Sequence, residues 1–431
     1  MFVGASARSQ YLRYHVLGVS FFLTVAAGLI AAKTIAFSAV VMFAIIVASE
    51  VRTWRDGLDY LKANHLVLIL GLLIVYAGLS LAWTPNPGTA AKHFAYFAIS
   101  STGMFVCVAL LTRAEISSSK ALMIASVWGC AIGIAYLATR QLNGIFMEKS
   151  FLPFSISKLI KFRTGEITRN FTPITLWIFP SLLWLLSALR PPMNKVLAGL
   201  LLAGATFTIA ISPHETSKIA LAASVATLLL ASISTRAAVR ILAFGWIACW
   251  LLVVPVSIFG FSYELQHSTW LPPTAQQRIL IWNVVGLDVL DHPISGRGLG
   301  STQANSPAIP DLSEFAYQQR NLPVPPNLTV FRANHAHNAY LQVWYELGAI
   351  GAALFMCLGL AILGAINRLE PQQQPAMLAT FGAASVILLP SYGIWQSWFI
   401  GMFALGVIMC AAACRSTSKK PNILSEVRLR Q

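Results

Sequence analysis

The sequence predicts an all-α polytopic membrane protein with about twelve transmembrane helices. Apolar residues make up 57% of its 431 residues, and charged residues make up only 10%. Soluble domains average about 45–50% apolar and about 25% charged residues, so a soluble protein of this composition could not cover its surface with polar groups. A mean hydropathy of +0.68 and a series of long apolar runs favour the same class.

Each predicted span is an apolar run close to the ~20 residues that a helix needs to cross the hydrocarbon core of a bilayer. In chain order the runs lie at 15–32, 34–49, 65–83, 94–112, 121–138, 171–188, 195–211, 217–235, 238–258, 338–364, 374–391 and 397–413. The arginines before the first run are not followed by a recognisable cleavage site, so we interpret this run as a transmembrane helix and not as a signal peptide. An even number of spans places both termini on the same side of the membrane.

The distribution of Lys and Arg predicts which side that is. With the N-terminus inside, the inner segments hold 17 Lys and Arg, whereas the short outer loops hold only Lys33, Lys92 and Lys218. Inner loops of membrane proteins carry the excess of positive charge, so we expect both termini in the cytoplasm. This topology also accounts for the net charge of +15, and we expect no nucleic-acid partner.

The predicted organisation has four parts. Residues 1–258 contain the first nine spans, 259–337 form a large outer loop, 338–413 contain the last three spans, and 414–431 form a cytoplasmic tail. The outer loop has a helical pattern in QQRILIWNVVGLDVLDHP followed by a Pro- and Asn-rich stretch, which predicts a small helical subdomain. All six cysteines fall in apolar runs, which leaves no disulfide framework and no CxxC pair.

A second outer segment, 139–170, has a net charge of +4. Positive charge on an outer segment opposes the topology bias, and two interpretations remain open. The stretch FLPFSISKLIKF could form an amphipathic helix at the membrane interface, or the segment could bind an anionic head group.

A cluster of polar residues lies where the large outer loop re-enters the membrane, in the sequence Arg332-Ala-Asn-His335-Ala-His337-Asn338. A histidine at this boundary can exchange a proton near neutral pH, which is typical of a general base. Glu346 follows nine residues after His337, and we expect it on roughly the same side of the helix, where it and Asn338 could orient the imidazole. Two alternatives are histidines that are satisfied by interfacial hydrogen bonds, and a metal site in which Asp291-His292 would supply the third ligand.

Four cationic residues share the outer face with this cluster, namely Arg163, Arg169, Lys218 and Arg278. Guanidinium groups bind phosphate oxygens in a bidentate manner, so such a set beside a base would suit transfer from a diphosphate-linked donor. Simpler roles are also open, because Lys218 could extend to the interface and Arg278 could pair with an acidic residue of the loop.

A glycine run, Gly296-Arg297-Gly298-Leu-Gly300, could allow close approach of the backbone to a ligand or could simply form a turn. The outer acidic residues contain no DxD or ExD pair. Carboxylate pairs of this kind usually bind Mg²⁺ or Mn²⁺, so we expect a metal-independent reaction without a cofactor.

These motifs resemble the O-antigen ligase and O-antigen polymerase superfamily. The resemblance is carried by Arg278 and Trp282, then Asp291-His-Pro-x-x-Gly296-x-Gly298-x-Gly300, then His335-x-His337-Asn338-x-x-Leu341 and Glu346-x-Gly348, together with a Trp83-Thr-Pro-Asn-Pro turn. It implies an inverting, metal-independent glycosyltransferase with a GT-C-like fold in the bacterial inner membrane. The donor would be a glycan on undecaprenyl diphosphate, and the acceptor a hydroxyl of the lipid A–core at the periplasmic face.

Within this resemblance His337 matches the base and Arg278 the loop arginine that contacts the diphosphate. Arg163 and Arg169 match arginines that precede the sixth span. Members of the family often have Ser-Arg at the outer end of the eighth span, where this sequence has Ser217-Lys218, so the charge is kept without the bidentate fork. His335, Asn338, Glu346 and Arg297 would support the site.

Three other functions remain open. An O-antigen polymerase and a protein O-oligosaccharyltransferase of the same superfamily would share the base and the arginines and would differ in the acceptor. A twelve-helix secondary transporter is an alternative from another class, but transporters place their ionisable residues near the middle of the membrane, where this sequence has almost none.

Overall fold

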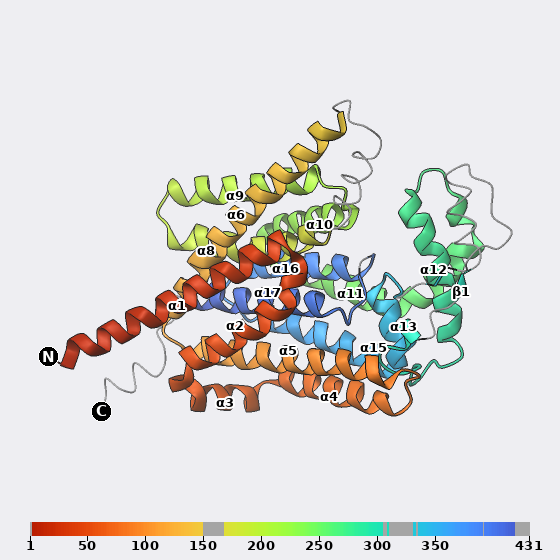
Figure 1. Cartoon of the computed structure of the whole chain (residues 1–431), viewed down its shortest axis with the longest axis horizontal. Helices are drawn as coiled ribbons and strands as arrows, with labels where there is room; N and C mark the ends of the chain where they lie inside the picture. The colour runs from red at the N-terminus through yellow and green to blue at the C-terminus, as the bar shows by residue number, and fades with distance from the viewer. Residues whose placement is uncertain are drawn as a thin grey trace.

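The computed structural model describes residues 2–149, 168–304, 308–309, 331–332, 335–390 and 392–418. Within these residues the chain forms a bundle of long helices (Figure 1), and its strands are a single antiparallel pair of two residues each, β1 (Ala308–Ile309) and β2 (Phe331–Arg332). Eleven helices of the described part are long and apolar enough to span a membrane. The protein is therefore an all-helical integral membrane protein, as its composition predicts.

The helices follow one another along the chain with mostly short connections. The first group is α1 (Phe2–Ile30), η1 (Ala32–Thr34), α2 (Ile35–Ser49), η2 (Val51–Thr53), α3 (Trp54–Ala63), α4 (His65–Leu79), η3 (Ser80–Ala82), α5 (Pro87–Arg113) and α6 (Ile116–Lys149). The second is η4 (Thr168–Phe171), α8 (Thr172–Ala188), α9 (Met193–Ala210), α10 (Glu215–Ile233), α11 (Thr235–Ser262), η5 (Leu265–His267), α12 (Pro273–Val289), α13 (Ser301–Ala304), α15 (Ala339–Ile366), α16 (Gln374–Leu388) and α17 (Ser397–Thr417).

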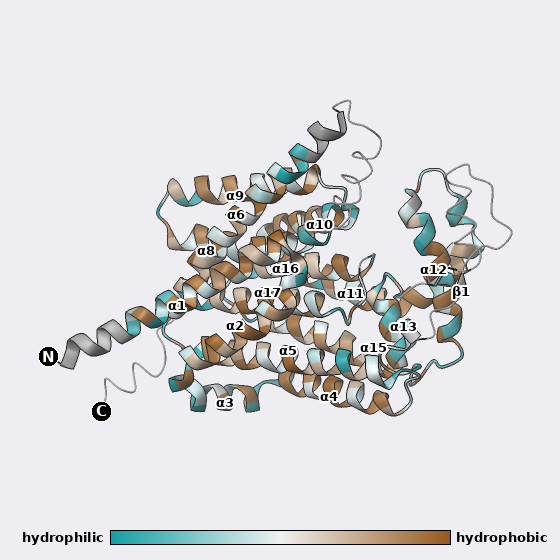
Figure 2. Ribbon diagram, viewed as in Figure 1, coloured by the Kyte–Doolittle hydropathy of each residue, from teal (hydrophilic) through white to brown (hydrophobic). Residues whose placement is uncertain are grey.

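The two ends of the bundle differ in character. The start of α1 and the end of α17 lie at one end, which we call the termini end, whereas α12 and α13 lie at the opposite end, which we call the loop end (Figure 1). Apolar residues cover the middle of the helices, and hydrophilic residues gather at α3 and around α12 and α13 (Figure 2). This is the pattern expected of helices that face lipid along their middle and water at their ends.

The centre of the bundle is α8, in which fourteen consecutive residues, 172–185, are buried. Its Trp177 indole donates a hydrogen bond to the Met402 carbonyl of α17 at 3.1 Å, and Trp177 also contacts Gly406. The loop end of α8 is fixed by Asn170, whose side chain donates to the Ile30 carbonyl and accepts from the Ala32 amide. The residues that precede α8 are thereby anchored to the turn between α1 and α2.

One predicted span is shorter than the rest. Helix α16 has fifteen residues, whereas η1 and η3 lengthen the fifteen-residue helices α2 and α4 to spans of eighteen. The sequence pattern continues to residue 391, but the helix ends at Leu388, shortly before Pro390. Proline has no amide hydrogen to continue a helix and restricts the residue before it. The chain instead turns at the loop end, over the described residues 389–390 and 392–396, before α17 begins.

Helix α15 is interrupted at Gly348, whose φ of 61° and ψ of −162° are not helical. The freed backbone groups are paired with the segment 293–298, since Ala349 donates to the Pro293 carbonyl and Ile350 to the Ile294 carbonyl, at 2.9 and 3.3 Å. A Cβ at position 348 would collide with the Ile294 carbonyl, so only glycine fits here. The large loop is therefore joined to a membrane helix through the backbone.

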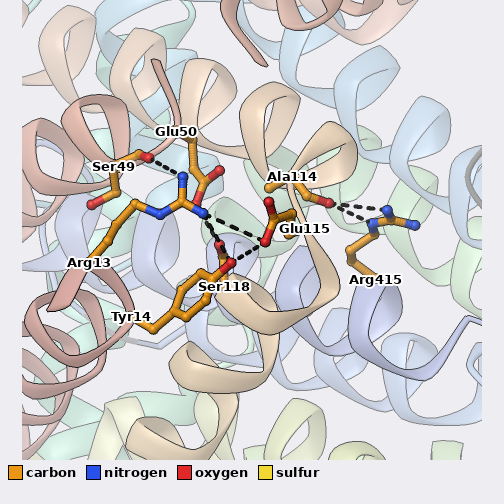
Figure 3. Close-up of polar contacts among 8 residues, drawn as sticks. All are labelled: Arg13, Tyr14, Ser49, Glu50, Ala114, Glu115, Ser118 and Arg415. Atoms are coloured by element: carbon orange, nitrogen blue, oxygen red, sulfur yellow. Dashed lines mark hydrogen bonds and ion pairs between the residues drawn. The ribbon is translucent and has the colours of Figure 1, made fainter. Parts of the chain in front are cut away.

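A polar network ties four helices together at the termini end (Figure 3). Arg13 of α1 donates to the Ser49 carbonyl at 3.1 Å and lies 3.8 Å from the Glu115 carboxylate. Ser118 of α6 donates to the buried Glu50 carboxylate at 2.5 Å, and Arg415 of α17 donates to the carbonyl of Ala114. These contacts hold α1, α2, α6 and α17 in register where their apolar packing ends.

Candidate functional site

The histidine-rich junction forms a tight turn directly before α15. His337 has a φ of 51°, in the left-handed region that few non-glycine residues adopt. Its backbone N–H donates to Nδ1 of His335 at 3.3 Å, and the two imidazole rings lie 4.0 Å apart. The Trp282 indole of α12 donates to the Ala336 carbonyl at 2.9 Å and holds the turn from the other side.

Asn338 ends this turn and begins α15. Its side chain accepts a hydrogen bond from the Leu341 amide at 3.1 Å, the geometry of a helix N-cap. Because the carboxamide is used by the helix, the structure places Asn338 as a support for the backbone next to His337.

Two of the predicted arginines come from distant parts of the chain and lie close enough to this turn to act on His335 electrostatically. Arg169 lies in η4 before α8, and Arg278 lies in α12. Burial, and then the positive charges of Arg169 and Arg278, lower the pKa of His335 from 6.5 to about 4. His335 is thus neutral at neutral pH, and both guanidinium groups lie close enough to act on it.

Tyr392 and His214 complete the same cluster. The Arg169 guanidinium lies over the Tyr392 ring at 5.8 Å, and the Tyr392 hydroxyl lies 3.3 Å from Nε2 of His214. Burial, and then the charges of Arg278 and Lys218, lower the pKa of His214 to about 4. The sequence analysis considered Ser217-Lys218 of this region but gave no role to His214 or to Tyr392.

The other two predicted diphosphate ligands are Lys218 and Arg163. Lys218 forms an ion pair with Glu215 one turn earlier in α10, at 3.0 Å, and about a third of its side chain is exposed. Its charge acts on His214, so it borders the cluster. Arg163 lies outside the described residues, as does the stretch FLPFSISKLIKF.

Arg297 contacts a separate group of residues. Its guanidinium is 3.0 Å from the Asp291 carboxylate and 3.7 Å from that of Asp288, and it lies over the Tyr345 ring at 5.8 Å. In this position it links the loop to α12 and α15. The contacts recorded in the described part of the chain support a role in holding the glycine run.

Glu346 is fully buried. Its carboxylate accepts hydrogen bonds from four donors, which are the Gly300 amide, the Thr302 hydroxyl, the Gln342 carboxamide and the Trp395 indole. The carboxylate joins the glycine run to the turn that contains Trp395.

The geometry of the site does not favour a metal ion. The residues that the structure describes contain no group of three His, Cys, Asp or Glu able to hold one. Asp291, the third ligand that the sequence offered, is paired with Arg297. His335 uses Nδ1 to accept the His337 amide. The cluster is better described as a set of cations around neutral imidazoles, an arrangement that can bind a polyanion beside a proton acceptor.

Comparison with known proteins gives the same family as the sequence motifs. Residues 197–356 match the family described as O-antigen ligase. This region contains His214, Lys218, α12, the glycine run and the histidine turn, so the chain carries an O-antigen ligase family domain.

Among curated proteins the chain is similar to candidate polysaccharide ligases of Rickettsia. It is 33% identical over 129 residues to that of Rickettsia conorii, which is 30% of this chain and 29% of the relative. It is 32% identical over 130 residues to that of Rickettsia prowazekii and 30% identical over 129 residues to that of Rickettsia typhi, with 30% of each chain covered. The match thus spans less than a third of the length of these relatives.

Proposed function

We propose that the protein is an inverting glycosyltransferase that transfers an O-antigen glycan from undecaprenyl diphosphate to a hydroxyl of the lipid A–core. The observation that supports this most is the electrostatic effect of Arg169 and Arg278 on His335, whose ring lies 4.0 Å from that of His337. The site lies at the end of the bundle opposite to the start of α1 and the end of α17 (Figure 1). With the termini in the cytoplasm, as the Lys and Arg distribution predicts, this end faces the periplasm.

In the proposed reaction His337 removes the proton from the acceptor hydroxyl. The oxygen then attacks the anomeric carbon, a new C–O bond forms, and the bond from that carbon to the diphosphate breaks with inversion. The proton remains on His337, and the electron pair leaves with the diphosphate. Arg169, Arg278 and, outside the described residues, Arg163 would stabilise the negative charge of this leaving group.

His335 supports this chemistry in two ways. It fixes the His337 backbone through its Nδ1 acceptor, and it stays neutral, since its pKa is lowered to about 4 by burial and by Arg169 and Arg278. A charged His335 would sit 4.0 Å, ring to ring, from the proposed base and would make it harder to protonate. A neutral neighbour therefore favours proton uptake by His337.

The test is transfer by purified protein in detergent with EDTA present. Undecaprenyl-diphosphate glycan and lipid A–core acceptor are supplied, and products are separated on a gel. We expect a ladder of glycosylated core with the wild type, none with His337→Ala, and a normal ladder with the exposed control His267→Ala. Transfer that survives in His337→Ala would contradict the assignment of the base.

The other functions of this superfamily give different products in the same assay. Elongation of the donor lipid without transfer to the core would show a polymerase. Transfer to an added acceptor peptide, and not to the core, would show a protein glycosyltransferase. Absence of every product with folded wild-type protein would contradict the proposal as a whole.

A further inference from the structure

His214 occupies an unusual place for a histidine, because it lies buried at the first turn of a membrane helix among cations. It precedes α10, and its carbonyl accepts from the amides of Ser217 and Lys218. Only 9% of the residue is exposed. Nothing in the proposed reaction requires this imidazole, so its contacts call for their own explanation.

Both nitrogens of the ring are occupied by hydroxyl groups. Nδ1 lies 2.7 Å from the Ser217 hydroxyl, and Nε2 lies 3.3 Å from the Tyr392 hydroxyl. The ring is also nearly parallel to that of Tyr392, at 14°, with 5.9 Å between centroids. A neutral imidazole has one donor and one acceptor, so it can satisfy both hydroxyls at once.

Tyr392 carries the contact onward to the arginine. The Thr168 side chain hydrogen-bonds the Tyr392 hydroxyl, and the guanidinium of the next residue, Arg169, lies over the Tyr392 ring at 5.8 Å. The ring is held in place by the edge contact of Trp398, at 4.9 Å between centroids. One consistent arrangement is a chain in which Thr168 donates to Tyr392, Tyr392 donates to Nε2 of His214, and Nδ1–H donates to Ser217.

This series of hydrogen bonds bears on Arg169, because the backbone and the side chain of Arg169 are held by different parts of the protein. Asn170 anchors the backbone to the turn between α1 and α2. The guanidinium lies over the Tyr392 ring, which comes from the turn after α16. An arginine has many rotamers, and fixing it before the ligand arrives saves the entropy that binding would otherwise lose.

We infer that His214 is a positioning residue for the diphosphate-binding arginine: bonded to Ser217, it fixes Tyr392, and Tyr392 aims Arg169 at the donor. This inference rests on the proposed function, and it assigns the α9–α10 turn a role in donor recognition. The charged groups around His214 are Arg278 from α12, Lys218 and Glu215 from α10, and Arg169 beside Tyr392. Three of these four are cations, which is why a neutral hydrogen-bonding ring suits the position and a second lysine or arginine would not.

The first experiment measures kinetics for both substrates with His214→Ala, His214→Gln and the exposed control His267→Ala. We expect His214→Ala to raise the KM for the lipid-linked donor about tenfold, as a loss of roughly 1.4 kcal/mol in binding would, and to leave the KM for the core acceptor unchanged. His214→Gln, which can still bond a hydroxyl, restores most of the donor affinity. An unchanged donor KM in His214→Ala, or equal losses for donor and acceptor, would overturn the inference.

A double-mutant cycle tests the route through Tyr392. Tyr392→Phe keeps the ring under Arg169 and removes the hydroxyl that His214 bonds. If the effect of His214 passes through that hydroxyl, then His214→Ala adds little to Tyr392→Phe, and the donor KM of the double variant stays within about twofold of that of Tyr392→Phe alone. Fully additive effects would refute this route.

Binding of undecaprenyl diphosphate alone separates this inference from the proposed function. It is measured with the purified full-length protein in nanodiscs and requires no transfer. Weaker binding by His214→Ala, with normal binding by His267→Ala, supports the inference even when no acceptor is glycosylated. If the wild type transfers glycan and His214→Ala binds undecaprenyl diphosphate as well as the wild type does, the proposed function stands and the role of His214 is refuted.

Discussion

The backbone N–H of His337 donates to Nδ1 of His335, and this 3.3 Å bond closes the left-handed turn that precedes α15. A left-handed conformation of a non-glycine residue costs of order 1–3 kcal/mol and persists only where its surroundings hold it. The turn thus commits His335 to a single tautomer, with Nδ1 free to accept and the proton on Nε2.

We predict that His335→Ala lowers kcat for glycan transfer by about tenfold or more, because the His337 turn loses its acceptor and relaxes. The KM for the donor should change little, since Arg169 and Arg278 remain. Steady-state kinetics in detergent measure both parameters. His335→Asn, which can still accept from the His337 amide, is the matched control and should retain more activity than His335→Ala.

Arg278→Lys should raise the KM for the donor, because lysine keeps the charge but cannot form two parallel hydrogen bonds to phosphate. Arg297→Lys provides the comparison, because Arg297 is paired with Asp291 and Asp288. We expect it to lower thermal stability and to leave the donor KM unchanged. Equal effects of the two substitutions on donor KM would show that Arg278 is structural as well.

Stability should fall as the pH drops from 6.5 towards 4. The pKa values of His214 and His335 are lowered from 6.5 to about 4, in both cases first by burial and then by nearby cations. Between these values the unfolded chain binds more protons than the folded protein, so acid favours unfolding, and the full contribution is present above pH 6.5. Unfolding followed by tryptophan fluorescence at pH 4.5 and 7.5 tests this, and a His214→Gln/His335→Gln double variant should show a smaller difference.

Gly348→Ala should destabilise the protein by at least about 2 kcal/mol, since alanine would have to adopt a positive φ and its Cβ would collide with the Ile294 carbonyl. Gly364→Ala in the same helix is the control, because no atom lies within 4 Å of a Cβ there. It should be neutral or raise stability by up to about 1 kcal/mol. A thermal-unfolding midpoint in detergent compares the two, and similar midpoints would contradict the role of the break.

Much of this architecture could be predicted from the sequence, because helices that face lipid must be long and apolar and because charge selects their orientation. The electrostatic effect of Arg169 and Arg278 on the His335–His337 turn followed from placing them all on one face. The roles of His214 and Tyr392 could not be predicted, since they depend on a contact across 178 residues between two turns. The four hydrogen bonds of Glu346 could not be predicted either, since their donors are Gly300, Thr302, Gln342 and Trp395, which come from three separate parts of the chain.

The short α16 has a consequence for how a lipid-linked substrate could reach the cluster. Fifteen residues span only about 22 Å, whereas the hydrocarbon core is about 30 Å thick. If α16 starts at the cytoplasmic boundary of the hydrocarbon core, the proposed function places the turn that carries Tyr392 near the depth of the donor's diphosphate. A diphosphate attached to a membrane-embedded chain could then meet Arg169 without being lifted into water, so the length of one helix would match the site to a substrate that never leaves the leaflet.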